Sequence, residues 1–246
     1  MNVPFLSGGA LAVASDGKQV DFMIHGLFSF SLFGQEIWIT TSHVSLLIII
    51  LLLIVFAWAA RRRMMRAEPV PGAFQNVVEW IVEMIDRMIA GIMGDCEEWF
   101  RNYIGAVFLF LLTSNLSGLF GIRPPTADFG VTLGLGLISF ALIQYFNIRH
   151  NRGRAFTDLF RPLPVLFPIN LIGEVATPLS LSLRLFGNVL SGTVMMALVY
   201  GLMPIFLKLG FPAVLHVYFD VFSGCIQAYV FCMLTMVFTR QKMKEE

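Results

Sequence analysis

Charged side chains are scarce in this sequence. Asp, Glu, Lys and Arg make up 13% of its 246 residues, whereas hydrophobic types make up 57%. Soluble domains contain about 25% charged and about 45–50% apolar residues. Because the buried fraction of a protein grows only slowly with chain length, one soluble core of this size has no room for so much apolar surface. The composition therefore indicates a protein that is partly solvated by lipid.

Several functional motifs are also missing. The formal net charge is only +1, which provides no basic field for nucleic acid. There is no glycine-rich loop ending in Lys-Ser or Lys-Thr, no cluster of His, Cys and carboxylates at metal-ligand spacing, and no nucleophile elbow. We therefore expect no bound nucleotide, cofactor or metal, and no catalytic site. The chain is expected to move something rather than to catalyse bond chemistry.

Cysteine is rare as well. Two of the three cysteines, Cys225 and Cys232, are seven positions apart in an apolar run. On one helix this spacing corresponds to about 10 Å of rise, which is beyond the reach of a disulfide. Cys96 is isolated in the sequence. All three are interpreted as small packing residues.

What the sequence has instead is five long apolar segments. They cover about 42–60, 103–122, 131–148, 168–207 and 211–238. A membrane-spanning helix needs about 20 apolar residues, and the last two segments exceed this length and should be strongly tilted. The predicted fold is an all-α polytopic membrane protein, with residues 1–41 as an outer N-terminal segment and 42–246 as a single membrane domain. Residues 1–20 carry no secretory signal and are expected to be irregular and polar.

Basic residues predict the orientation of these segments. They cluster after the first, third and last spans, at Arg61, Arg62, Arg63 and Arg66, at Arg149, His150, Arg152, Arg154 and Arg161, and at Arg240, Lys242 and Lys244. The positive-inside rule places all three clusters on the cytoplasmic side. The N-terminus is then outside, and the turn near Pro204 and Gly210 is an outer one.

Residues 71–95 form a different kind of segment. Apolar side chains recur there at three- and four-residue spacing, with charged ones such as Glu79, Glu83 and Arg87 between them. This pattern predicts an amphipathic helix that begins near Pro71. It is too charged to span a membrane and should lie at the cytoplasmic interface.

The fourth segment carries a buried arginine within a polar stripe. The stripe consists of Thr177, Ser180, Arg184, Asn188 and Ser191, at helical spacing. A guanidinium at mid-bilayer costs roughly 3 kcal/mol on insertion scales, and it does not lose its charge. Arg184 is too deep for a side chain that snorkels from a helix end. It must therefore face a carboxylate or a wet cavity.

The last segment carries a second polar stripe, His216, Asp220, Ser223 and Gln227, whose spacing predicts one helical face. Asp220 is an ionisable group in the membrane, suited to ion transfer or to a structural pair near the outer interface. His216, nearer the outer turn, is either packed at the interface or part of proton uptake. Neither stripe gives Arg184 an obligatory partner. Its counter-charge is therefore expected from another subunit.

Glu174 precedes Arg184 by ten residues, or about 15 Å of helix on the cytoplasmic side. Two interpretations remain open for this carboxylate. It lines an inner aqueous exit, or it pairs with Arg161 or another cytoplasmic arginine.

These segments resemble a known family. The run PINLIGE at 168–174, the run PLSLSLRLFGN at 178–188 and the run IQAYVF at 226–231 are similar to the signature of subunit a of F-type ATP synthases. The resemblance covers the whole chain in layout and is most specific over 168–238. It implies a stator subunit of the bacterial plasma membrane that contacts a ring of c subunits, the subunit b stalk and the rest of the complex.

The resemblance also implies roles for individual residues. Arg184 would be the arginine that faces the ring carboxylates, with Asn188 and Gln227 near it. Asp220 would line the outer half-channel and Glu174 the inner one, and Ser180, Ser223 and His216 would add polar groups to the ion path. Thr193 stands where many relatives have Glu or His, so ion uptake should depend more on Asp220. The alternatives are an independent secondary transporter or antiporter, and Na⁺ in place of H⁺ as the coupling ion.

Overall fold

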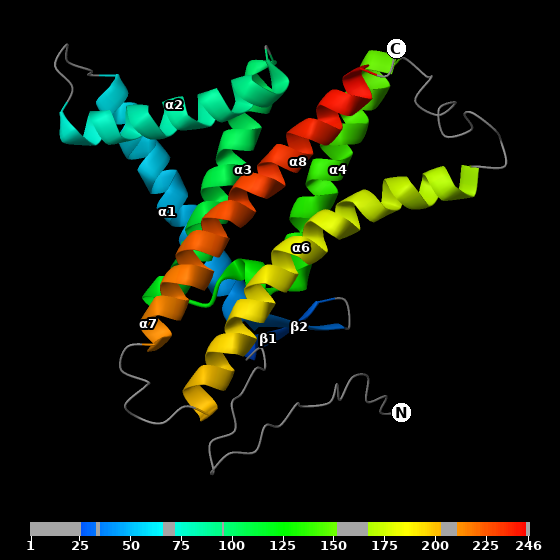
Figure 1. Ribbon diagram of the computed structural model, residues 1–246. Coiled ribbons are helices and arrows are strands. Elements are labelled where there is room, and N and C mark those ends of the chain that lie inside the picture. The colour runs from blue at the N-terminus through cyan, green and yellow to red at the C-terminus, as the bar shows by residue number, and fades with distance from the viewer. Residues whose placement is uncertain are drawn as a thin grey trace.

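The protein is a helical bundle with an oblique last pair of helices (Figure 1). The structure, a computed structural model, describes residues 26–32, 35–65, 72–94, 96–151, 167–202 and 211–244. The expected irregular segment 1–20, Arg66, Pro71, the basic residues Arg152, Arg154 and Arg161, and the turn at Pro204 and Gly210 lie outside these ranges.

Five helical stretches are long and apolar enough to cross a membrane: Thr41–Met64, Glu98–Phe120, Phe129–His150, Phe167–Gly201 and Val214–Met243. They belong to α1 (Thr41–Met64), to α3 (Glu98–Leu116) with η1 (Ser117–Phe120), to α4 (Phe129–Asn151), to α6 (Phe167–Leu202), and to α7 (Phe211–His216) with η5 (Val217–Ser223) and α8 (Gly224–Lys244). The predicted fold class, an all-α polytopic membrane protein, is confirmed over these residues.

The amphipathic helix is also confirmed. It is α2, Ala73–Met93, and it is not among the helices that qualify as spans. Val78, Ile85 and Ile89 are buried on one face, and Trp80 and Val82 remain more than half exposed. In Figure 1, α2 lies across the end of the bundle where α1, α4 and α8 also end. The basic residues Arg61, Arg149 and Arg240 therefore gather at one end of the molecule, as the charge pattern requires.

A short hairpin that the sequence pattern did not predict precedes α1. Strand β1 (Gly26–Leu32) pairs antiparallel with β2 (Gln35–Thr40), with Phe30 opposite Ile37 in the register. The hairpin lies at the end of the bundle away from α2 (Figure 1). It leads directly into α1, which is the most peripheral of the long helices, with 11% of its apolar window buried.

The core lies where α3, α4, α6 and α8 meet. Its fully buried members include Phe100 and Leu111 of α3, Leu185 of α6, and Cys232 and Met236 of α8. Small residues allow this approach: a β-carbon on Gly136 of α4 would lie 2.9 Å from the carbonyl oxygen of Pro178 in α6. All three cysteines are free thiols, as the spacing of Cys225 and Cys232 predicts.

Helix α6 is 36 residues long and contains Pro178. A helix of that length measures about 54 Å, against a hydrocarbon core of about 30 Å. Pro178 has no N–H for the carbonyl oxygen of Glu174, and proline inside a helix bends it. Figure 1 shows α6 curving from a direction across the bundle into one beside α7. The predicted strong tilt of the last two spans agrees with this course.

Candidate functional site

The last span contains a seven-residue π-helix, η5, at Val217–Ser223. A π-helix holds about one more residue per turn than an α-helix and often marks a functional segment. Residues before and after it therefore point in different directions around the helix axis than they would in a continuous α-helix. The spacing that predicts one face for His216, Asp220, Ser223 and Gln227 assumes a regular α-helix, which η5 interrupts.

Asp220, in the middle of η5, sits against the end of α3. Its Oδ2 is 2.7 Å from Nδ1 of His216, one turn earlier. A β-carbon on Gly118 would lie 3.1 Å from Asp220 Oδ1, so the carboxylate packs on this glycine. His216 continues the contact outward, because its Nε2 is 3.4 Å from the hydroxyl of Tyr200 on α6. Tyr200, His216 and Asp220 thus form a line of polar groups.

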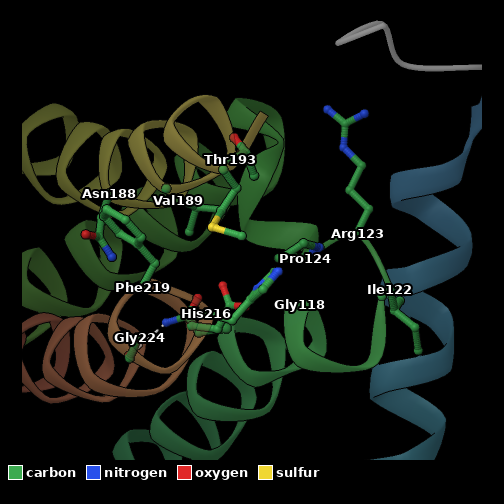
Figure 2. A pocket seen from close by; sticks show the side chains of 15 residues that line it. Gly118, Ile122, Arg123, Pro124, Asn188, Val189, Thr193, His216, Phe219 and Gly224 are labelled. Atoms are coloured by element: carbon green, nitrogen blue, oxygen red, sulfur yellow. Dashed lines mark hydrogen bonds and ion pairs between the residues drawn. The ribbon is translucent and has the colours of Figure 1, made fainter. Parts of the chain in front are cut away.

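A cavity of about 300 Å³ opens beside Asp220. Three elements contribute its walls: the end of α3 with the following turn, α6, and the segment that includes η5. Figure 2 shows Asn188, Val189 and Thr193 of α6 on one side, with His216 and Phe219 opposite them. The guanidinium of Arg123 extends away from these side chains at the rim. The cavity brings together Asn188, His216 and Asp220, three of the residues singled out from the sequence.

Ser223 links the last span to α6. Its hydroxyl donates to Asn188 Oδ1 at 2.7 Å. Asn188 is thereby held at the cavity wall, one turn after Arg184. Gln227 lies one turn further along α8 and is 8% exposed.

Asn115, Thr126 and Gly118 are the site residues that the sequence reasoning did not select. Asn115 Nδ2 donates to the carbonyl oxygen of Gly224 at 2.9 Å, directly after η5, and Thr126 Oγ1 donates to Asn115 Oδ1 at 3.0 Å. Asn115 and Thr126 are buried. The turn after α3 is thus joined through Asn115 to the residue that follows the π-helix. An asparagine inside an apolar span was the available signal.

Arg184 lies on the outward face of α6. Its side chain is exposed in the isolated chain, and no hydrogen bond or ion pair of this residue occurs within the described ranges. Large apolar side chains near it on α6 are exposed too, including Leu183 at 53% and Leu190 at 43%. Ser180, one turn before Arg184, shares this exposed face. A permanent charge thus stands on an apolar surface without a partner among the described residues.

Glu174 lies in a separate polar cluster near the basic end. Lys242 Nζ of α8 is 2.6 Å from Glu174 Oε1, and Gln144 Nε2 of α4 donates to Oε2 at 2.5 Å. One of the two open interpretations was that Glu174 pairs with a cytoplasmic arginine. The structure shows a pair with a basic residue, but this residue is Lys242. Arg161 is outside the described residues. Glu174 and Asp220 are thus in two distinct clusters, one on each side of Arg184 along α6 and its neighbours.

Comparisons with known proteins show which sequences this chain resembles. The family model described as ATP synthase A chain matches residues 43–240. The chain is 39% identical over 195 residues to "ATP synthase subunit a, sodium ion specific" of Propionigenium modestum, covering 70% of this chain and 64% of that protein. It is 29% identical over 243 residues to ATP synthase subunit a of Oceanobacillus iheyensis, covering 91% and 97%. It is 33% identical over 199 residues to ATP synthase subunit a of Bacillus pumilus, covering 72% and 82%.

Proposed function

This chain belongs to the ATP synthase A chain family, and we propose that it is the stator subunit that provides two ion half-channels and presents Arg184 to a rotating ring of c subunits. The family supports a role in the membrane sector of ATP synthase. The proposal adds the ion path, the ring partner and the role of each residue.

The observation that carries the proposal is the exposed position of Arg184, which has no partner among the residues that the structure describes. An isolated guanidinium facing lipid is costly, and it does not escape this cost by losing its charge. A carboxylate carried past α6 by a neighbouring subunit would remove this cost. The exposed apolar side chains around Arg184 fit a surface that is covered in an assembly.

The cavity at Asp220 supports the outer half-channel. It contains a titratable carboxylate, the imidazole of His216 and the amide of Asn188. Such groups relay protons or solvate a cation where hydrocarbon does not. The cluster around Glu174 supports the inner half-channel, because it places a carboxylate near the basic end of the bundle.

The mechanism then needs only electrostatics. An ion enters through one half-channel and neutralises a ring carboxylate, which can then face lipid. After the ring has turned, the ion leaves through the other half-channel and Arg184 stabilises the carboxylate in its ionised form. The fixed cation also prevents a direct leak between the half-channels. One charge crossing 100 mV releases about 2.3 kcal/mol, so several ions must cross for each ATP.

The proposed partners are the c-ring, the subunit b stalk and the other subunits of the complex, within a bacterial plasma membrane. The N-terminus would be outside and the C-terminus cytoplasmic, as the basic clusters at Arg61, Arg149 and Arg240 require. H⁺ is the proposed coupling ion. Na⁺ is the alternative, because the Propionigenium relative is named as sodium ion specific.

Substitution of Arg184 tests this proposal. We expect Arg184→Ala to abolish ATP-driven ion pumping in inverted membrane vesicles while the complex still co-purifies with its ring. Arg123→Ala is the matched control, because Arg123 stands at the cavity rim with its charge directed away (Figure 2). Normal pumping by Arg184→Ala would overturn the proposal. Ion flux by the purified chain alone would instead support an independent transporter.

A further inference from the structure

We propose that Lys242 sets the ion affinity of the inner half-channel, because its ammonium group occupies a cation position on Glu174. The coupling ion would then reach this carboxylate only by displacing the ammonium group. This inference rests on the proposed function, since it concerns the same ion path. It assigns a role to the C-terminal end of α8, which the polar stripes do not include.

Three helices converge on the Glu174 carboxylate. Lys242 of α8 contacts Oε1 at 2.6 Å, and Gln144 of α4 donates to Oε2 at 2.5 Å. Asn147, one turn after Gln144, donates to Gln144 Oε1 at 3.4 Å. Both carboxylate oxygens are thus occupied by donors from other helices. The groups from α4 are neutral amides, so the positive charge at the site is supplied by Lys242.

The pair is well enclosed for an ion pair at the end of a helix. The side chains of Lys242 and Glu174 are 24% and 22% exposed. Partial burial reduces solvent screening and strengthens the attraction relative to an exposed pair. Arg240, half a turn earlier, donates to the carbonyl oxygen of Ile92 in α2. This contact ties the end of α8 to α2, and it does not involve Lys242 or Glu174.

An ammonium group tethered in this way acts as an internal competitor. Its local concentration is set by the fold and does not change with the medium. A proton or Na⁺ must compete with it for one carboxylate, so Lys242 sets the ion concentration at which the inner opening works. Removing the ammonium should strengthen ion binding at Glu174. Uptake from the inner side then needs less ion, and release to that side becomes slower.

The test is the ion dependence of the intact ATP synthase carrying Lys242→Gln, in inverted vesicles and proteoliposomes. During ATP-driven pumping, the half-saturating concentration of the coupling ion should fall by roughly three- to tenfold, the range expected when a partly enclosed ion pair is lost. The half-saturating concentration is measured by varying Na⁺ at fixed pH and by varying pH at fixed Na⁺. Ion-driven ATP synthesis should become slower. Lys242→Arg, which keeps the charge, should stay near the original ion dependence.

Arg240→Gln is the matched control, because it removes a neighbouring charge and a helix contact without touching Glu174. The same shift in Arg240→Gln would overturn the inference and indicate a general loosening of α8. An unchanged half-saturating concentration in Lys242→Gln, with normal assembly, would also overturn it. If either of these results occurs while Arg184→Ala abolishes pumping, only the inference about Lys242 fails and the proposed stator function stands. Normal pumping in Arg184→Ala would overturn both the proposed stator function and the inference about Lys242.

Discussion

The carboxylate of Asp220 rests directly on Gly118, so that a β-carbon on this glycine would lie 3.1 Å from Oδ1. The atoms that would meet it belong to the end of a short side chain, and the two flanking elements need not separate. We therefore expect Gly118→Ala to fold and assemble normally but to turn Asp220 away from its present position.

ATP-driven pumping should fall by roughly two- to tenfold in Gly118→Ala, because moving a side chain off its rotamer costs about 0.5–1.5 kcal/mol. The measurement is fluorescence quenching in inverted vesicles, normalised to the amount of complex. Gly134→Ala is the control, since a β-carbon there meets nothing within 4 Å. Equal pumping by the two variants would argue against a role for the Gly118 contact.

Asp220→Asn should slow ion uptake from the outer side, because a neutral amide does not accept and release a proton. The amide can keep the 2.7 Å contact with His216, so the fold should survive. We expect ion-driven ATP synthesis to drop by roughly a hundredfold, the lower end of what positioned proton-transfer groups contribute.

Asp128→Asn is a matched acid-to-amide control for that prediction. Asp128 Oδ1 accepts from the backbone N–H of Gly130 at 2.9 Å at the start of α4, a contact that asparagine can also make. Synthesis should be unchanged in this variant. Unchanged synthesis in Asp220→Asn would remove Asp220 from the proposed outer half-channel.

Gly224→Ala should destabilise the protein rather than alter its ion dependence. A β-carbon at this position would lie 2.8 Å from the β-carbon of Asn115, so α3 and the start of α8 would have to separate. Overpacking of this kind costs about 1–3 kcal/mol. It would also strain the bond from Asn115 to the Gly224 carbonyl, which is 2.9 Å long.

The measurement is the thermal unfolding midpoint of the complex in detergent. The midpoint should fall in Gly224→Ala, whereas in Gly201→Ala it should stay or rise slightly, because the space at Gly201 is open and alanine favours the helix. An unchanged midpoint in Gly224→Ala would show that the helices tolerate the extra atom.

Much of the fold follows from the sequence because apolar length and charge placement are local properties. The five long helices and α2 are confirmed, since about 20 apolar residues or an amphipathic period identify such segments without reference to neighbours. The basic ends gather on one side for the same reason. The β1–β2 hairpin was missed because its two short strands give a weak pattern.

The site was harder to predict because it depends on contacts between distant segments. Helical spacing selected Asn188, His216 and Asp220, which do line one cavity. It did not select Asn115, which is separated by 109 residues from Gly224, its hydrogen-bond partner. Nor does the sequence period reveal η5, since a π-helix has no apolar repeat of its own. The partner of Glu174, Lys242, is 68 residues away for the same reason.

The bend of α6 at Pro178 has a geometric consequence for any path through the molecule. Glu174 precedes the bend and Asn188 follows it, so the two polar clusters are about 21 Å apart along a helix that changes direction between them. The two clusters therefore do not lie along one straight helix axis. Under the proposed function, an ion delivered to one cluster would reach the other only with a ring carboxylate that moves past α6 between them.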